Sequence, residues 1–473
     1  MKSGPAKPLW QLSATEIAHR IRTGSTSSED VINAHLQRLA DVNPALNAVV
    51  VERAEAALRE AQEADRLQAS GATLGPLHGV PVAVKVNTDL ASAPNTNGVE
   101  ALKHVVAPAD NPCLKNLKDA GAIVIGQTNT PAYSMRWHTD NELHGQTLNP
   151  WSAAHTSGGS SGGASSAVAA GIAPIAHGND IAGSIRYPAF CCGLVGVRPS
   201  HGRVPSFNPS APGARPISAQ FMAVQGPLTR TVADARLALA VMSAGDPNDT
   251  RWVDTPLVGP AIPEPRRVAL VVNPAGRGVT DAIAASTREA GDWLTAAGYA
   301  VEEVEPPELG YVADLWARIG MDDVIRLLEP EVAAHGDPGI QHALGLWRKA
   351  HPVEGPQAVI DALQDRDRVL RLWQLFLEDY PLVVMPSSTI PPFAAGIDAR
   401  EFEDFERIWN AQLPQLALPV LGLPGIAVGT GVSDGLPLGV QIISRRFRED
   451  WCLDAAEVIE SRAGISLPID PRP

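Results

Sequence analysis

A segment rich in serine and glycine raises the question of whether one of its serines attacks a substrate, and which group would take the proton of that serine. Segment 157–166 (SGGSSGGASS) holds five serines and four glycines, Ser184 follows it in AGSIR, and Lys85 lies in the β-branched run GVPVAVKVN. A serine hydroxyl attacks a carbonyl effectively only when a neighbouring base accepts its proton. A lysine can be that base when burial lowers its pKa from about 10.4 to about 7–8. A serine with such a lysine beside it in the fold would therefore be suited to acyl transfer.

Segment 157–166 also has simpler and competing interpretations. Stretches rich in glycine and serine are often flexible loops. A phosphate-binding loop would end in GK[ST], but this segment contains no lysine. Residues 159–163 match G-x-S-x-G, the nucleophile elbow of α/β-hydrolases, although the preceding WSAAHTSGG is not expected to be the strand that such an elbow requires. The chain has no S-x-x-K, which excludes the simple β-lactamase arrangement.

The sequence around these residues resembles the amidase signature family, whose usual text is close to GGSSGG, T-D-x-G-G-S-I-R-x-P-A and C-G-x-x-G-x-K-P-T-x-G-R. This chain has GGSSGG at 158–163, NDIAGSIRYPA at 179–189 and CGLVGVRPSHGRV at 192–204. Similar blocks are HGVPVAVKVNTDL (78–90), QTNTPAYSMRWHTDNELHGQTLNPW (127–151) and LGLPGIAVGTGVSDGLPLGVQIIS (421–444). The resemblance spans nearly the whole chain and is densest from Gly79 to Pro205.

The resemblance implies a catalytic set of Lys85, Ser160 and Ser184. Ser184 would be the nucleophile, Ser160 a relay held after a cis peptide bond from Gly159, and Lys85 the base. Ser184 lies 24 residues after Ser160, which is the spacing that the family has. The glycine-serine segment would then supply the relay, and the attacking serine would lie outside it.

The same resemblance implies an oxyanion hole and supporting residues around the nucleophile. The oxyanion hole would consist of the backbone N–H groups of Ile181, Ala182, Gly183 and Ser184. The supporting residues would be Gly159, Ser161, Asp180 and Arg186. Asp180 and Arg186 flank the nucleophile and would hold its turn by an ion pair or hydrogen bonds, a role that is equally compatible with plain scaffolding.

The family's segment around 134–141 predicts one wall of the substrate pocket. Its expected lining residues are Ser134, Met135 and Asn141, together with Trp137, Thr139 and Asp140. The remaining wall is expected from the divergent region around 315–375, whose amphipathic helices could line an apolar channel with some of their Trp, Ile and Leu side chains.

Three positions depart from the family's usual residues. Val86 replaces the usual aspartate after the lysine, which removes a hydrogen-bonding partner near Lys85. Asn179 replaces threonine, and Ala182 replaces the first glycine of the oxyanion turn. The last two changes also occur in family members that resemble nylon-oligomer hydrolases, so they are expected to modulate the site without disabling it.

Histidine and cysteine side chains are weaker candidates for the catalytic base and the nucleophile. None of the twelve histidines forms HExxH or another metal-binding spacing. A Ser-His-Asp triad stays open, because its members need not be close in the chain. The histidines within or beside the signature blocks, interpreted as loop or supporting residues, are His138, His144, His155 and His177. Cys191 lies in an apolar context and is interpreted as a packed small residue.

The elements that must position these residues alternate between helix and strand. Segment 1–70 is predicted to be helical, with a capping box at 13–16, helical apolar spacing over 27–39 and a charged helix over 53–67. A strand is expected at 79–87, a helix with Asn111 as its cap and Pro112 at its first position, and a strand at 122–125. A Pro-rich connector at 255–267 precedes another αβ alternation, and a hairpin turns at 434–435.

This alternation favours an α/β fold with a large mixed sheet. The resemblance implies one large amidase-signature domain over 1–473, with a central mixed twisted β-sheet and helices on both faces. Its signature core would span about 79–205, after an N-terminal helical segment (1–70) and before a divergent substrate-pocket region (about 255–400).

The composition is that of an ordinary globular protein, with 45% hydrophobic and 19% charged residues. The net charge of −14 is not offset by any cluster of lysine and arginine, which argues against nucleic-acid and anionic-membrane partners. The four cysteines form no CxxC, and neither a signal peptide nor a membrane span is recognised. A cytoplasmic protein without cofactor or metal is expected.

These observations predict a serine amidohydrolase that forms a covalent acyl-enzyme with a small-molecule amide or carbamate. The family includes hydrolases of aliphatic, aryl and fatty amides, nylon oligomers, indoleacetamide and carbamates (urethanase activity), and no motif selects one of them. The alternative is the glutaminase subunit of a tRNA-dependent amidotransferase complex, with a dedicated partner surface. A hydrolase would instead be self-sufficient, with a homodimer as one compatible assembly. A non-catalytic binding relative is disfavoured by the intact set of Lys85, Ser160 and Ser184.

Overall fold

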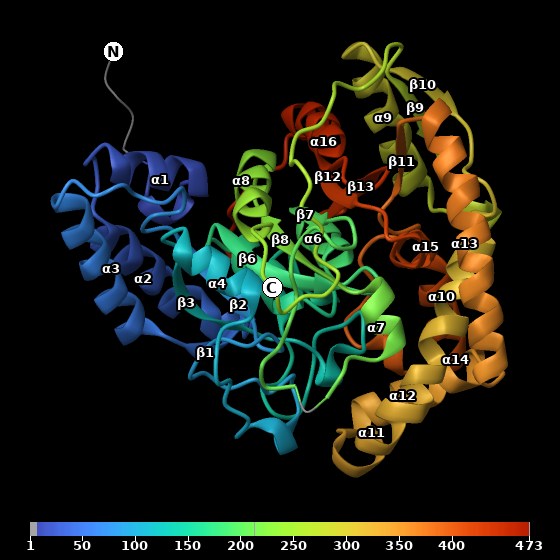
Figure 1. The fold of residues 1–473 in the computed structure, drawn as a ribbon, viewed down its shortest axis with the longest axis horizontal. Helices are drawn as coiled ribbons and strands as arrows, with labels where there is room; N and C mark the ends of the chain where they lie inside the picture. The colour runs from blue at the N-terminus through green and yellow to red at the C-terminus, as the bar shows by residue number, and fades with distance from the viewer. Residues whose placement is uncertain (1–6, 212, 473) are drawn as a thin grey trace.

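The computed structural model describes residues 7–211 and 213–472, and over these residues eleven strands form one mixed β-sheet (Figure 1). The strands of this sheet are β1 (Val49–Glu52), β2 (Pro81–Lys85), β3 (Ile123–Thr128), β6 (Ile175–Asp180), β7 (Val195–Arg198), β8 (Val224–Thr229), β9 (Arg267–Leu270), β10 (Ala300–Glu303), β11 (Leu382–Pro386), β12 (Gly425–Ser433) and β13 (Leu436–Ser444). Their order across the sheet is β1-β3-β2-β6-β8-β7-β12-β13-β11-β9-β10. The expectation of a single large α/β domain with a mixed sheet is confirmed.

Strand β2 lies between β3 and β6 and is parallel to both. Its β-branched residues suit a strand that is buried on both faces, and all five of its residues are buried. Ala83 pairs with Ala176, so β2 and β6 end at the same edge of the sheet. Because the carboxyl ends of parallel strands meet at one edge, Lys85 is brought next to Asn179 and Asp180.

Hydrophobic side chains cover both faces of the sheet. Along β2, Val82 and Val84 belong to one buried cluster and Ala83 to another, as the two-residue period of a strand requires. The helices with buried residues in the cluster of Ala83 are α2 (Ser28–Leu46), α3 (Ala54–Ala69), α5 (Gly162–Ala169), α6 (Arg186–Cys192), α7 (Ile217–Met222), α10 (Leu309–Asp323), α11 (Glu329–His335), α12 (Pro338–Ala350), α13 (Pro356–Asp379), α14 (Phe402–Ala411) and α15 (Leu413–Leu421).

The opposite cluster contains residues of α1 (Ala14–Arg22), α4 (Pro112–Asp119), α8 (Val232–Met242) and α16 (Glu449–Ala463), while α2 and α9 (Asp281–Ala296) contribute to both clusters. Two short helical turns also border the site, η3 (Ala132–Ser134) and the π-helical segment η5 (Val324–Leu328). Within residues 7–211 and 213–472, no helix combines the length and the apolar composition needed to cross a bilayer.

Several local predictions are confirmed. Ser13 and Glu16 form a capping box at the start of α1. The Asn111 side chain accepts a hydrogen bond from an α4 backbone N–H, and Pro112 occupies the first turn. Residues 434–435 form the turn between β12 and β13.

The prediction that no strand precedes the glycine-serine segment is wrong. Residues Ser152–Thr156 form β5, which pairs with β4 (Leu148–Asn149) in a separate two-stranded ribbon. Alternation of small and β-branched residues is too weak a signal to reveal so short a ribbon. Because β5 lies outside the main sheet, the serines that follow it do not occupy the main-sheet elbow of an α/β-hydrolase.

Candidate active site

Lys85 is a fully buried lysine with two polar neighbours at the edge of the sheet. Its Nζ lies 2.7 Å from the Oγ of Ser160 and 2.8 Å from the Oδ1 of Asn179. Burial lowers the pKa of Lys85 well below its usual range, although the Asp180 carboxylate acts in the opposite direction. Burial therefore favours the uncharged amine, which is the form that can accept a proton.

Ser160 is held beside this lysine at the start of α5. The Gly159–Ser160 peptide bond is cis, as the resemblance implies. A Cβ atom at position 159 would lie 2.4 Å from the carbonyl oxygen of Arg136, so the close backbone approach requires glycine. The neighbouring Ser161 is fully buried, and its hydroxyl has no hydrogen-bond partner among the described residues.

Ser184 lies on the turn between β6 and α6 and faces the same cavity as Ser160. This cavity has a volume of about 750 Å³ and is also lined by Asn179, Asp180 and Ile181. Ser160 and Ser184 are 1% and 5% exposed, so both serines lie at its floor, where little water reaches them. The structure thus places Ser160 and Ser184 in the lining of one cavity, with the buried amine of Lys85 in contact with Ser160.

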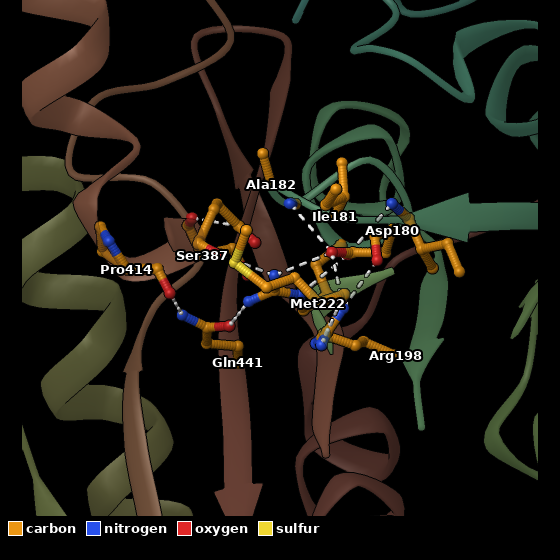
Figure 2. A network of polar contacts seen from close by, with 12 residues as sticks. Asp180, Ile181, Ala182, Arg198, Met222, Ser387, Pro414 and Gln441 are labelled. Atoms are coloured by element: carbon orange, nitrogen blue, oxygen red, sulfur yellow. Dashed lines mark hydrogen bonds and ion pairs between the residues drawn. The ribbon is translucent and has the colours of Figure 1, made fainter. Parts of the chain in front are cut away.

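A buried ion network holds the turn that carries Ser184 (Figure 2). The Asp180 carboxylate accepts hydrogen bonds from Arg186 Nε and Nη2 at 3.0 and 3.1 Å and lies 3.3 Å from Arg198 Nη1. Burial alone would raise the pKa of Asp180, but the two guanidinium groups and the N–H of Gly183 hold it well below its usual range. The predicted ion pair of Asp180 with Arg186 is confirmed, whereas the role of Arg198 was not foreseen.

The turn 180–184 leaves three backbone N–H groups free to bind an anion. The N–H of Gly183 donates to Asp180 Oδ1 at 3.0 Å and is therefore engaged within the protein. The N–H groups of Ile181, Ala182 and Ser184 have no hydrogen-bond acceptor in the part of the chain that the structure describes. Gly183 has φ of +94°, and a Cβ there would meet the Gln415 side chain at 2.6 Å.

The comparisons with known proteins agree with this geometry. Residues 30–453 match the family model described as Amidase. The chain belongs to the amidase signature family. It is similar to an indoleacetamide hydrolase of Bradyrhizobium diazoefficiens, at 47% identity over 463 residues that cover 98% of this chain and 88% of the relative.

Two more distant relatives span almost the whole of this amidase. A glutamyl-tRNA(Gln) amidotransferase subunit of Moorella thermoacetica is 31% identical over 479 residues, which are 96% of each chain. The crystal structure of a bacterial aryl acylamidase of the same family superposes with a TM-score of 0.84 at 27% identity, over 97% of each chain. This protein is therefore an amidase-signature amidohydrolase.

The predicted pocket wall of the amidase is only partly formed by the expected residues. Ser134 and Met135 line the cavity. Asn141 is not among the lining residues, and its Nδ2 instead donates to Asn129 Oδ1 at 2.9 Å and to the carbonyl of Thr130 at 2.7 Å. Asn141 therefore braces the loop behind the wall. The other residues of this block that do not line the cavity are Trp137, Thr139 and Asp140.

The remaining wall of the amidase comes from two later parts of the chain. The divergent region contributes, as expected, through Trp316, Asp323 and Leu327 of α10 and η5. A longer stretch, with lining residues between Ser206 and Gln225 and again over 248–251, was missed by the sequence analysis. Its signal was the Pro- and Gly-rich text SFNPSAPGARP directly after the signature core, which is typical of a surface loop.

Uncharged side chains occupy two positions near Lys85 at which the family's usual motif has other residues. Asn179, in the place of threonine, donates from Nδ2 to the Oδ1 of Asn87 at 2.8 Å. Asn87 donates in turn to the Oγ of Ser134 at 2.9 Å. Val86, in the place of aspartate, is fully buried and offers no charge. The lysine is therefore oriented through Asn179 by a row of uncharged side chains.

The histidines near the signature blocks of the amidase are engaged elsewhere. His177 Nε2 lies 2.6 Å from Gln225 Oε1, and burial lowers the pKa of His177 to about 4. His138 Nδ1 lies 3.0 Å from Thr156 Oγ1. None of the four histidines named from the sequence lines the cavity, and Cys191 is buried. No group of three His, Cys, Asp or Glu side chains in the described ranges could hold a metal ion.

Proposed function

We propose that this amidase hydrolyses small, uncharged arylacetamides through a Ser-cisSer-Lys triad of Ser184, Ser160 and Lys85. The observation that carries the proposal is the buried contact of 2.7 Å between Lys85 Nζ and Ser160 Oγ, at the floor of a cavity that Ser184 also faces. A buried amine beside a hydroxyl has little purpose for folding, because burial of a lysine is unfavourable. It serves as a base instead.

The reaction begins with proton transfer along the triad. The uncharged Lys85 amine accepts the Ser160 hydroxyl proton while Ser160 takes the proton of Ser184, whose Oγ forms a bond to the amide carbonyl carbon. The carbonyl oxygen becomes an oxyanion and accepts hydrogen bonds from the N–H groups of Ile181, Ala182 and Ser184. Gly183, whose N–H is bound to Asp180, takes no direct part in this hole.

The same protons then complete the hydrolysis. Lys85 returns its proton through Ser160 to the departing nitrogen, the C–N bond breaks, and Ser184 is left as an acyl ester. Water attacks the ester while Lys85 again accepts a proton through Ser160. Lys85 then returns this proton through Ser160 to the Ser184 oxygen as the ester C–O bond breaks, so that Ser184 leaves as a hydroxyl group and a carboxylic acid is released.

The substrate class rests on the cavity and on one relative. The apolar and aromatic lining residues are Tyr133, Met135, Ile181, Phe207, Trp316, Val324, Leu327 and Leu328. Such a lining suits a flat apolar group, and a volume of about 750 Å³ exceeds that of a bicyclic arylacetamide. The relative at 47% identity bears the name indoleacetamide hydrolase, which supports indole-3-acetamide as the first compound to assay.

The decisive experiment compares the wild-type chain with Ser184→Ala on indole-3-acetamide, by release of ammonia and of the acid. The variant should lose at least about 10⁴-fold in kcat, because the nucleophile is absent. Circular dichroism and thermal unfolding of both proteins check that the variant is folded. A folded Ser184→Ala enzyme with wild-type turnover would refute the proposal.

The acyl range is tested with two matched compounds that release 4-nitroaniline, a short acyl anilide and an O-alkyl carbamate. Turnover of the anilide alone limits the enzyme to amides. Steady turnover of both extends it to carbamates, and a single burst with the carbamate means that its less electrophilic acyl-enzyme resists water. Linear 6-aminohexanoate oligomers test nylon-type substrates in the same way.

A glutaminase subunit is the second candidate, supported by the 31% identity with the Moorella amidotransferase chain. A hydrolase acts alone, as a monomer or homodimer, without nucleic acid. We expect the purified chain to hydrolyse indole-3-acetamide at a rate that added tRNA does not change, and to leave glutamine intact. Turnover of glutamine but not of arylacetamides would favour the glutaminase. Size-exclusion chromatography with light scattering gives the assembly.

A further inference from the structure

Every carbonyl oxygen in the turn 180–183 accepts a hydrogen bond from a donor outside the turn. The carbonyls of Asp180, Ile181, Ala182 and Gly183 accept, in that order, from Arg198 Nη1 at 2.7 Å, Trp316 Nε1 at 2.6 Å, Trp137 Nε1 at 2.9 Å and the Tyr187 N–H at 2.8 Å. Two of the four donors are therefore indole groups, and both come from outside the turn and the helix that follows it.

A held carbonyl fixes the direction of an N–H group. The peptide unit is planar and trans, so the carbonyl of one residue and the N–H of the next point in opposite directions. The bond from Trp316 to the carbonyl of Ile181 thereby orients the N–H of Ala182. The bond from Trp137 to the carbonyl of Ala182 orients the N–H of Gly183, which donates to Asp180.

The two indoles cannot turn freely, because they belong to a packed tryptophan cluster. Trp137 follows η3, and its ring lies 5.7 Å from the rings of Trp347 and Trp409, on α12 and α14. Trp316 of α10 lies 5.7 and 5.9 Å from the same two rings. All four side chains are buried. Aromatic packing of this kind has defined geometry and restricts rotation of each ring.

We propose that Trp137 and Trp316 are positioning residues for the oxyanion-binding turn, an inference that rests on the proposed function. Trp316 holds the peptide plane that carries the Ala182 N–H, and Trp137 holds the next plane, whose Gly183 N–H is bound to Asp180, so that the Ala182 N–H is aimed and the turn is fixed before substrate arrives. Trp316 also lines the cavity, where it would contact the acyl group of a substrate bound to Ser184. The side chain that contacts an aromatic acyl group is thus the same one that orients the Ala182 N–H toward the oxyanion.

Substitution by phenylalanine tests the indole N–H separately from the ring. Trp137 does not line the cavity, so Trp137→Phe should lower kcat on indole-3-acetamide about 10- to 100-fold with KM within about twofold. Trp316→Phe should lower kcat to a similar extent and also raise KM. Trp373→Phe is the matched control, because its buried indole donates to the carbonyl of Pro307 at 2.9 Å, away from the cavity lining.

An inhibitor that mimics the oxyanion gives a second readout. An aryl trifluoromethyl ketone forms a tetrahedral adduct with a serine, whereas the arylacetate product requires no oxyanion. Trp137→Phe should weaken the ketone by the same factor as it lowers kcat/KM, and it should leave product inhibition within about twofold. A purely structural role would weaken both ligands together, or neither.

The outcomes separate this inference from the proposed function. The inference is overturned if both Trp137→Phe and Trp316→Phe lose no more kcat than Trp373→Phe while Ser184→Ala is inactive. If Ser184→Ala retains activity, the proposed function itself fails. Thermal unfolding of each variant accompanies the kinetics, and if Trp137→Phe does not fold, the kcat and the ketone affinity of Trp316→Phe decide the question.

Discussion

The burial of Lys85 favours its proposed role as a base but lowers the stability of the folded protein. Its amine is fully buried, and burial lowers its pKa well below the usual range. In the unfolded chain the same amine has a pKa of about 10.4 and binds a proton more readily. Because the unfolded state then holds more protons, the free energy of unfolding falls as pH falls through the interval between the two values.

Lys85→Met is therefore expected to abolish activity and at the same time to increase the free energy of unfolding at neutral pH. The apolar methionine removes the cost of burying an amine, and it also removes the base. Denaturant titrations at several pH values check this, with the difference between variant and wild type growing as pH is lowered. A variant that is less stable than wild type at every pH would contradict the expectation.

The acid limb of the wild-type pH–activity profile should report the ionisation of Lys85. Lys85 acts as a base only when it is uncharged, so kcat/KM should fall with one proton as pH decreases through its folded pKa. Asn179→Asp places a carboxylate 2.8 Å from the amine, in the position of the present Oδ1, and so raises the pKa of Lys85. The acid limb should move to higher pH.

Asn179→Thr is the matched control, because threonine restores the family's usual residue without adding a charge. Its acid limb should stay near the wild-type position, with kcat within about tenfold. If Asn179→Asp and Asn179→Thr shift the profile equally, the contact with Asn179 does not govern the lysine.

At the scale of elements, the junction of β6 and α6 depends on the buried charge of Asp180. Its carboxylate accepts hydrogen bonds from Arg186 and from two backbone N–H groups, those of Gly183 and Ile185, with Arg198 beside it.

Asp180→Asn leaves two buried guanidinium groups with insufficient negative charge and should cost about 3–5 kcal/mol of stability. Asp367→Asn, which breaks an exposed pair with Arg371, should cost less than about 1 kcal/mol. Urea unfolding of the three proteins measures the difference, and equal costs would contradict it.

Local sequence patterns predicted the structural elements that depend on residues close together in the chain. The β-branched run to Lys85, the cap at Asn111 and the hairpin turn at 434–435 each depend on neighbouring side chains, and all three are present. The ribbon that contains β5 was missed, since five residues of weak strand propensity decide nothing alone. Long-range contacts were equally invisible: the bond from Trp316 to the carbonyl of Ile181 joins residues 135 positions apart.

The members of the proposed triad were easier to select from the sequence than the residues of the cavity wall. Lys85, Ser160 and Ser184 lie in motifs whose residue types are demanded by chemistry. Asn141 looked like a pocket residue because it lies in such a motif, but its amide braces a loop instead. The wall from 206 to 225 has no motif, because many apolar and polar side chains can enclose the same space.

At the scale of the whole molecule, the cavity joins segments that are far apart in the chain. Its floor comes from the strand ends and the turn 180–184, and its walls come from 206–225, 248–251 and α10 with η5. Phe207 stands in this wall at 39% exposure. Phe207→Ala should raise KM for indole-3-acetamide about fivefold, through lost apolar contact, with kcat within about threefold.

Steady-state kinetics check this prediction, and Phe402→Ala on α14, outside the cavity lining, is the control that should leave KM unchanged. A fall of kcat beyond tenfold in Phe207→Ala, with KM unaltered, would place Phe207 in the chemistry rather than in the wall.

The division between floor and wall also bears on how such an enzyme changes over generations. The residues proposed to move protons are held by buried strands, a buried ion network and a glycine that admits no side chain. Many of the residues that line the rest of the cavity lie on loops, where insertions and substitutions are tolerated. Substitutions confined to the cavity wall could therefore change which acyl group the enzyme accepts. Each intermediate variant would still cleave an amide bond.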